Sequence, residues 1–177
     1  MYKFLLKRKI KKLIKKPGRE RVFLNMKEIN SVMVLFEMED FEDANYFIKQ
    51  LKKMGKRIKV FAYKNSKDAN SYSKVSYTPV IRKKMKYLSS GSLTQVVDNL
   101  ISERFDMVVD FTLKENLLLI YILAAANSPL KVGFHNYFPR VHDIIFSDTP
   151  DSEQNMRDLG EHLIYYLSVI SSKSINP

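Results

Sequence analysis

Two kinds of hydrophobic pattern alternate along this chain. Short, nearly continuous apolar runs are typical of strands covered on both faces, and apolar residues spaced three or four apart are typical of helices with one buried side. The runs that predict strands lie at residues 31–36, 57–63, 105–111, 130–134 and 143–146. The segments with helical spacing lie at residues 44–54, 96–101, 117–124 and 156–170. This alternation predicts a single Rossmann-like α/β domain with three layers and a mostly parallel sheet.

Residues with strong local preferences mark several boundaries. Asp40 is placed to cap the helix that follows the first strand, and Gly55 is placed to end it. The Ser-x-x-Gln sequence at 92–95 has the pattern of a capping box, and it follows a short predicted strand at 86–88. Residues 64–79 are polar and rich in Asn, Ser and Tyr, so we expect a long loop there.

A separate helical pattern occupies residues 1–16, ahead of the α/β pattern. The apolar stripe of this helix consists of Tyr2, Leu6, Ile10, Leu13 and Ile14, and Phe4 and Leu5 lie off the stripe. Pro17 and Gly18 end the helix, because proline removes a backbone donor and glycine adds backbone freedom. We therefore divide the chain into a basic amphipathic helix at 1–16, a connector at 17–30 and the α/β domain at 31–177.

The unusual charge of the chain is concentrated in its first residues. The formal net charge is +11, and residues 1–21 hold ten of the 30 Lys and Arg residues but one acidic residue, Glu20. The net charge is therefore +9 in that segment and +2 in the remainder, which resembles an ordinary soluble domain. The signal for a partner lies in the basic segment.

Three interpretations of the basic helix stay open at this point. It can lie on an anionic membrane, where each Lys or Arg near the surface contributes about 1 kcal/mol. It can follow the phosphates of a nucleic acid, or dock its stripe on the rest of the chain and leave the lysines in solvent. The residues expected to contact an anionic surface are Lys3, Lys7, Arg8, Lys11, Lys12, Lys15, Lys16 and Arg19.

Several chemical classes need residues or motifs that this sequence lacks. Without Cys, it has no disulfide, no thiolate zinc site and no cysteine nucleophile. It has no apolar run of the roughly 18 residues that a membrane-spanning helix needs, and no signal-peptide pattern. A Gly-x-Ser-x-Gly motif and a Gly-rich turn after the first strand are also missing. We expect a cytoplasmic protein, peripheral at the inner face of the membrane, with no catalytic residues, no bound metal and no cofactor.

Acidic residues gather after the first predicted strand. They are Glu37, Glu39, Asp40, Glu42 and Asp43. With Asp110 at the carboxyl end of another strand, they can form an oxygen-ligand Mg²⁺ site that loosely resembles that of receiver domains. Alternatively, they cap a helix, favour its dipole and otherwise face solvent.

The chain has three histidines, of which two flank one loop. His135 and His142 lie on either side of this loop, which follows a predicted strand. Two histidines without a carboxylate at a recognisable spacing specify neither zinc nor a general base, so we expect them to be structural. His162 lies among helical residues and is expected to be partly buried. The candidate ligand site at the strand ends is Glu37, Asp40, Asp110 and His135.

The order of these motifs also suggests relatives. A basic N-terminal helix, an apolar run at 32–36, a second run at 105–110 and the sequence at 128–133 follow one another. This arrangement resembles an uncharacterised family of small bacterial proteins of unknown function, over nearly the whole chain. Through Asp110 and the Lys-Val-Gly strand at 131–133, it also resembles, more weakly, the N-terminal half of heptosyltransferase-like glycosyltransferases. Those enzymes use a second Rossmann-like domain for the nucleotide-sugar donor, so this resemblance implies a related fold or a degenerate half-domain.

These patterns predict a non-enzymatic binding or regulatory module that residues 1–21 recruit to an anionic surface, a membrane first. Nucleic-acid binding through the same segment is one alternative. A small Mg²⁺-dependent enzyme that uses Glu37, Asp40 and Asp110 is another. The stripe of the helix can also pair two copies of the chain into a homo-oligomer, and the sequence identifies no small-molecule ligand.

Overall fold

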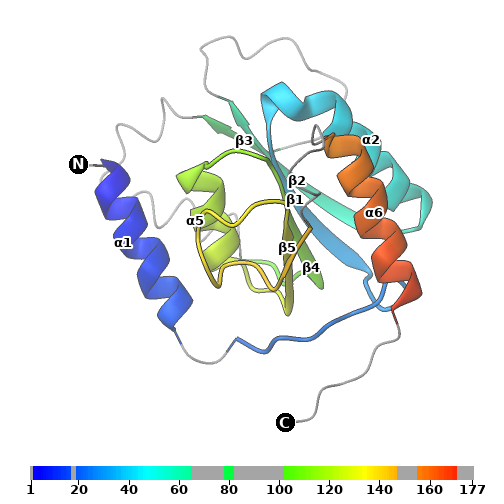
Figure 1. Ribbon diagram of the computed structural model, residues 1–177, viewed down its shortest axis with the longest axis horizontal. Helices are drawn as coiled ribbons and strands as arrows, with labels where there is room; N and C mark the ends of the chain where they lie inside the picture. The colour runs from blue at the N-terminus through cyan, green and yellow to red at the C-terminus, as the bar shows by residue number, and fades with distance from the viewer. Residues whose placement is uncertain (1, 17–18, 65–77, 82–101, 147–154, 171–177) are drawn as a thin grey trace.

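The strands form one parallel sheet (Figure 1). The computed structural model describes residues 2–16, 19–64, 78–81, 102–146 and 155–170. The strands in these ranges are β1 Ser31–Glu37, β2 Arg57–Lys64, β3 Thr78–Ile81, β4 Met107–Phe111, β5 Leu130–Gly133 and β6 Ile144–Ile145. Their order across the sheet is β3-β2-β1-β4-β5-β6, and each strand is parallel to its neighbours. The predicted α/β fold with a mostly parallel sheet is confirmed.

Helices cover both faces of this sheet (Figure 1). The helices are α1 Tyr2–Lys15, α2 Phe41–Lys53, α5 Leu117–Ala125 and α6 Met156–Val169, with a short 3-10 helix η1 Met38–Asp40 between β1 and α2. On one face, α2 and α6 enclose a core that includes Phe47 and Val109. On the other face, α5 and α1 enclose a core that includes Leu35 and Val108. Adjacent residues of a strand point to opposite faces, which is why Val108 and Val109 belong to different cores.

The apolar stripe of α1 packs on the chain itself. Leu6 and Ile10 are fully buried, and Leu13 and Ile14 pack at the edge of the same core, next to α5. α5 is apolar on all sides, as expected of a helix that lies between a sheet and a second helix. The structure therefore favours the interpretation in which the stripe docks on the rest of the chain. In this arrangement the stripe is already covered, and α1 belongs to the folded domain.

The connectivity of the sheet reverses between β1 and β4. From β1 the chain runs outward through β2 to β3, and it then returns to β4 on the other side of β1. In open parallel sheets, ligands bind in the crevice at the carboxyl ends of two strands related in this way. At the opposite end of the pair, the Asp106 carboxylate accepts bonds from the N–H groups of Asn30 and Ser31, each at 2.9 Å. A functional site is therefore sought at the carboxyl ends of β1 and β4.

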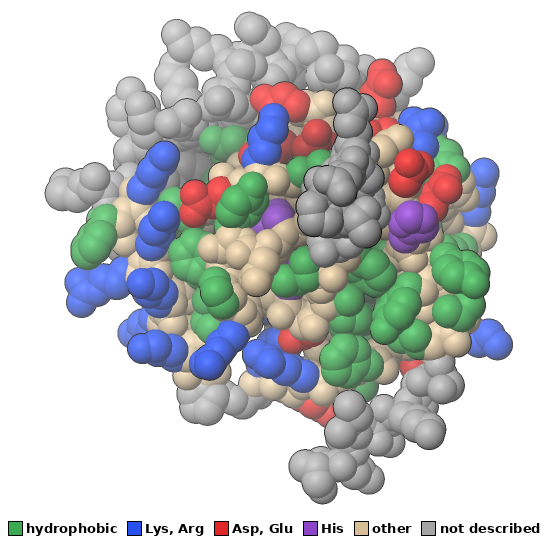
Figure 2. Space-filling view, viewed as in Figure 1, with side chains coloured by type: hydrophobic (Ala, Val, Ile, Leu, Met, Phe, Trp, Pro, Cys, Tyr) green, Lys and Arg blue, Asp and Glu red, His purple; other side chains and the backbone are tan. Residues whose placement is uncertain are grey.

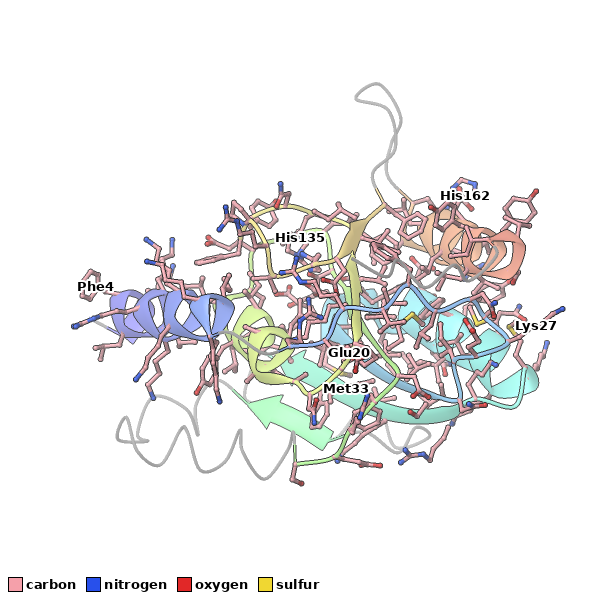
Figure 3. All side chains as sticks on the ribbon, turned by 90° about the horizontal axis from the view of Figure 1, so that it is seen from below. Phe4, Glu20, Lys27, Met33, His135 and His162 are labelled. Carbon is pink, nitrogen blue, oxygen red and sulfur yellow. The ribbon has the colours of Figure 1, made fainter. Side chains whose placement is uncertain are left out.

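One local prediction holds in part and another was wrong. Asp40 is the N-cap residue of α2, as predicted, but its side chain makes no capping hydrogen bond, because its backbone lacks the extended conformation of a capping residue. His162 is exposed rather than partly buried, because it lies off the stripe of α6 that buries Leu159 and Leu163. Figure 3 shows His162 on the outer side of that helix.

Other predictions meet the limits of the described residues. β3 begins at Thr78, within the segment expected to be a loop up to residue 79. The predicted strand at 86–88, the capping box at 92–95 and the helical face at 96–101 lie outside the described residues, as does the side chain of Tyr2.

Candidate functional site

A carboxylate is fully buried near the carboxyl end of β4. Asp110 has no exposed surface, and its strand neighbours Val109 and Phe111 both point into the core under α2 and α6. Asp110 therefore points to the opposite face of the sheet, where α5 lies. A charge in this position is stable only if hydrogen bonds or ions compensate for its lost hydration. The side chains that surround Asp110 decide what the site can do.

Two histidines and a threonine converge on this carboxylate. Oδ2 of Asp110 lies 3.0 Å from Nε2 of His135 and 3.2 Å from Nε2 of His142. The Thr112 hydroxyl donates to Oδ1 at 2.9 Å and lies 3.1 Å from Nε2 of His135. The two imidazole rings meet edge to face, with their centres 5.4 Å apart. Both histidines are more than nine-tenths buried, and Figure 3 shows His135 in the loop that follows β5.

The glycine of the Lys-Val-Gly strand makes room for one of these rings. Gly133 pairs with Asp110 in the register of β4 and β5, so the two residues lie side by side on the sheet. A Cβ atom at position 133 would lie 2.3 Å from Nε2 of His142 and 2.4 Å from its Cδ2. No side chain fits there while the ring contacts Asp110. Gly133 therefore serves the packing of His142.

The loop between β5 and β6 is anchored at both ends. Near its start, the N–H of Tyr137 donates to Nδ1 of His135 at 3.4 Å, and the two rings lie 4.5 Å apart. At its end, the carboxylate of Asp143 accepts a bond from the N–H of Lys131 at 2.8 Å, and the N–H of Asp143 donates to the Lys131 carbonyl at 2.7 Å. These bonds hold the segment from His135 to His142 across the end of β5.

The hydrogen bonds keep Asp110 ionised despite its burial. Desolvation alone raises the pKa of this carboxyl, but the bonds from His135 and His142 outweigh it and hold the pKa below its ordinary value. At least one imidazole must therefore present an N–H to Oδ2. Nδ1 of His142 is buried and has no hydrogen-bond partner among the described residues. The chain thus leaves one ring nitrogen of this cluster unsatisfied.

Glu37 and Asp40, the two acids predicted to join this site from the end of β1, make contacts with other residues. Glu37 accepts a bond from the Asn116 side chain at 2.7 Å, and Asn116 also caps α5. Burial raises the pKa of Glu37, and the bond from Asn116 partly offsets this effect. Burial also raises the pKa of Asp40, and nearby Lys114 lowers it. Of the four predicted strand-end residues, the structure joins Asp110 directly to His135.

The geometry of the cluster fits a metal site of mixed oxygen and nitrogen ligands. One ligand atom from each of Asp110, His135 and His142 lies within 4.8 Å of the other two. A tetrahedral ion with bonds of about 2.0–2.1 Å separates its ligand atoms by about 3.3 Å, which is close to the 3.0 and 3.2 Å measured here. No fourth His, Asp or Glu joins this group in the described parts of the chain. The protein would therefore supply three ligands.

Comparison with known sequences places the chain in a family. The sequence model of a family of unknown function, DUF6913, matches residues 3–170. The chain belongs to the DUF6913 family. No curated protein and no solved structure matched, so the resemblance to glycosyltransferases stays a prediction. The DUF6913 match includes all of α1 except Tyr2, as well as Asp110, His135 and His142, so both the basic helix and the buried cluster lie within the family domain.

The outer face of α1 in this DUF6913 domain is basic and exposed. Figure 2 shows Lys and Arg side chains gathered on the left of the view, over α1. The exposed members are Lys3, Lys7, Arg8, Lys11, Lys12, Lys15 and Lys16. Phe4 and Leu5 are also exposed, by 68% and 43%, and Figure 3 shows Phe4 at the free end of the helix. None of the described helices has the length and apolar character to cross a membrane.

Arg19, which was predicted to contact an anionic surface, faces inward. Its guanidinium donates to both carboxylate oxygens of Asp143, with Nη1 2.7 Å from Oδ2, and to the carbonyl of Ser128 at 3.1 Å. Asp143 is almost fully buried in this ion pair. Arg19 thus links the connector after α1 to the loop that carries the two histidines.

Proposed function

We propose that this domain binds a divalent transition-metal ion through Asp110, His135 and His142, and that this centre is where it acts. One observation carries the proposal: two imidazole Nε2 atoms lie 3.0 and 3.2 Å from the same oxygen of a fully buried carboxylate. Asp110 lies near the carboxyl end of β4, one of the two strands between which the connectivity reverses, and open parallel sheets bind ligands at that position.

The donor atoms decide the class of ion. Imidazole nitrogen suits Zn²⁺, Fe²⁺, Co²⁺ and related ions, whereas Mg²⁺ takes oxygen ligands, so this set favours a transition-metal ion over Mg²⁺. It differs from the sequence-based expectation, which was no metal, with a Mg²⁺ site only as an alternative. Three protein ligands leave a coordination position for water or a substrate atom, which is the arrangement of catalytic rather than structural zinc. A bound ion of this kind supplies Lewis-acid chemistry and lowers the pKa of its water.

Metal binding also requires particular tautomers of the two histidines. Nε2 of His135 can hold a metal only if its hydrogen moves to Nδ1, which now accepts the N–H of Tyr137. At 3.4 Å that bond is at the long limit for an N–H donor and costs little to open. Nδ1 of His142 has no partner that opposes the change. A small shift of the loop therefore converts the hydrogen-bonded cluster into a ligand set.

Titration of the full chain with zinc and with cobalt tests the proposal. We expect one equivalent of Zn²⁺ to bind and Co²⁺ to give the visible absorption of a site with nitrogen and oxygen ligands. Asp110→Asn and His135→Asn should each abolish both signals, while His162→Asn, which alters an exposed histidine, should not. Circular dichroism establishes that each variant is folded. Zinc binding of equal stoichiometry in a folded Asp110→Asn variant would show that the cluster is a set of hydrogen bonds alone.

As a second function, we propose that the basic face of α1 attaches the domain to an anionic membrane. The exposed Lys and Arg residues of α1, together with the exposed Phe4 and Leu5, support this. Basic residues near anionic lipid each contribute about 1 kcal/mol, and aromatic and aliphatic side chains can enter the headgroup boundary. Because Leu6 and Ile10 hold α1 to α5, attachment uses the outer face of the helix and not its buried stripe.

Point variants test this second function better than truncation, because removal of α1 would uncover the apolar surface of α5. Arg8→Gln with Lys12→Gln should weaken binding to phosphatidylglycerol vesicles by roughly 30-fold, since two basic residues are lost. Lys52→Gln with Lys53→Gln makes the same charge change on the exposed end of α2 and should have little effect. An equal loss of vesicle binding in both double variants would refute α1 as the specific membrane-binding surface. If the protein binds single-stranded RNA but not vesicles, the partner of α1 is a nucleic acid and not a membrane.

A further inference from the structure

A pocket lies on the same face of the sheet as the buried cluster but between different residues. It has a volume of about 320 Å³ and lies between the end of α1 and its connector, the end of α5, and the loop after β5. Its basic lining consists of Lys16, Arg19, Arg21, Lys131 and Arg140. The rest of its lining is mostly apolar and includes Leu13, Ile14 and Val141. Asp110, His135 and His142 do not line it.

The positive charge of this lining exceeds the negative charge beside it. Among the described residues, Asp143 is the acid that forms ion pairs with this lining: its carboxylate is bound by Arg19 and lies 3.4 Å from Nε of Arg21. Lys16 and Arg140 have no side-chain ion pair or hydrogen bond with any described residue. Lys16 and Arg140 are therefore free to bind a ligand, whereas Arg19 is held by Asp143.

Lys131 is a buried cation in the lining of this pocket. Its side chain is 2% exposed, and its Nζ donates to the carbonyl of Ala124 at 3.0 Å. Burial, with Arg19 and Arg21 nearby, lowers the pKa of Lys131 to about 7, although Asp143 raises it. A bound anion would offset the repulsion among these cations. The pocket therefore has the electrostatics of an anion site.

We propose that this pocket binds a phosphate group, with the unpaired Lys16 and Arg140 as its direct ligands and the buried Lys131 as a further cation of the lining. Arg140 has the planar donors that match phosphate oxygens, and Lys16 adds a mobile charge. The apolar side chains of Leu13, Ile14 and Val141 in the lining suit the carbon skeleton of a phosphate ester. The carbonyl at the end of α5, which would repel an anion, is covered by its bond from Lys131.

Titration of the full chain with inorganic phosphate at constant ionic strength tests this pocket. Lys16→Gln and Arg140→Gln should each weaken binding by about tenfold, the typical loss of one charge-assisted hydrogen bond. Lys11→Gln removes the same charge from an exposed position of α1 outside the pocket and should change the affinity less than about twofold. No binding of phosphate, or an equal loss in Lys11→Gln, would overturn the proposal.

Two further arms separate this pocket from other sources of phosphate affinity. The Asp110→Asn variant should keep full phosphate affinity, because the metal ligands do not line the pocket. If that affinity disappears, the phosphate binds at the metal and the pocket is not its site. Vesicles in which phosphatidic acid replaces phosphatidylglycerol at equal charge show whether the phosphate is that of a lipid. If Arg140→Gln loses binding to the phosphatidic acid vesicles but keeps binding to the phosphatidylglycerol vesicles, the ligand of the pocket is a lipid headgroup.

Discussion

Substitution of Gly133 by alanine should damage the buried cluster through a single methyl group. The new Cβ would lie 2.3 Å from Nε2 of His142, so the ring must move by about 1 Å to reach an ordinary contact. That movement breaks the 3.2 Å contact with Asp110 and removes one donor from a buried carboxylate. Loss of such a bond costs about 1–3 kcal/mol and overpacking costs a similar amount, so we expect a loss of about 3 kcal/mol in the free energy of unfolding.

Urea unfolding and zinc titration of Gly133→Ala measure the two consequences. The unfolding midpoint should fall, and zinc affinity should fall with it, because His142 is displaced as a ligand. Gly55→Ala is the control: Gly55 has a φ of +76° with open space around it, so alanine there costs about 1 kcal/mol through the backbone. Its zinc affinity should be unchanged. A Gly133→Ala variant with wild-type stability and zinc affinity would refute the packing of His142 against this glycine.

Three other predictions concern the packing of α1 and the charges around the pocket. Ile10→Ala should lower the free energy of unfolding by about 2–4 kcal/mol in urea, because Ile10 is fully buried, while Phe4→Ala should change it by less than about 0.5 kcal/mol. Lys131→Met should stabilise the protein near pH 7. The pKa of Lys131 in the folded protein lies below 10.5, so between the two pKa values the unfolded chain binds one more proton than the folded chain. As the pH drops from 10 to 7, the free energy of unfolding of the wild type should therefore fall relative to the variant by about 1.4 kcal/mol per pH unit. Parallel urea titrations with no divergence between the two proteins over that range would contradict the shift. Asp143→Asn should lower the free energy of unfolding by roughly 2–4 kcal/mol, because it weakens a buried ion pair. It should also tighten phosphate binding, because it frees Arg19. Urea unfolding should therefore show a less stable protein, and calorimetry should show a higher affinity for phosphate.

The sequence predicted the fold because hydrophobic periodicity is a local signal. The apolar run at β1 and the spaced residues of α2 both read correctly, and parallel pairing follows from their alternation. The order of the strands depends on which edges pair in space, and no local pattern reports it. Asp40 shows a similar limit of the sequence pattern. The residue pattern does not reveal the short η1 helix that ends at Asp40, directly before α2.

The site was half visible in the sequence. Asp110 and His135 were both placed in the predicted ligand site, but both loop histidines were expected to be structural and His142 was left out. The carboxylate that His142 contacts lies 32 positions away in the chain, so no local spacing reports the pair. A stronger signal was present: Asp110 interrupts a strand whose neighbours are buried on both faces, and a charge in such a strand requires partners. The adjacent strand and its loop can supply those partners, and the two histidines lie there.

The two proposed sites share one stretch of chain, from Leu130 to Asp143. On β5, Val132 points into the core under α2 and α6, so Lys131 and Gly133 both face α5. Lys131 then reaches the phosphate pocket, while Gly133 admits His142 to the metal cluster. Asp143 closes the stretch by binding both the Lys131 backbone and Arg19. α1 and its connector form one wall of the pocket, and Arg19 of the connector binds Asp143 at the end of the loop that carries the histidines. They are therefore an integral part of the folded domain.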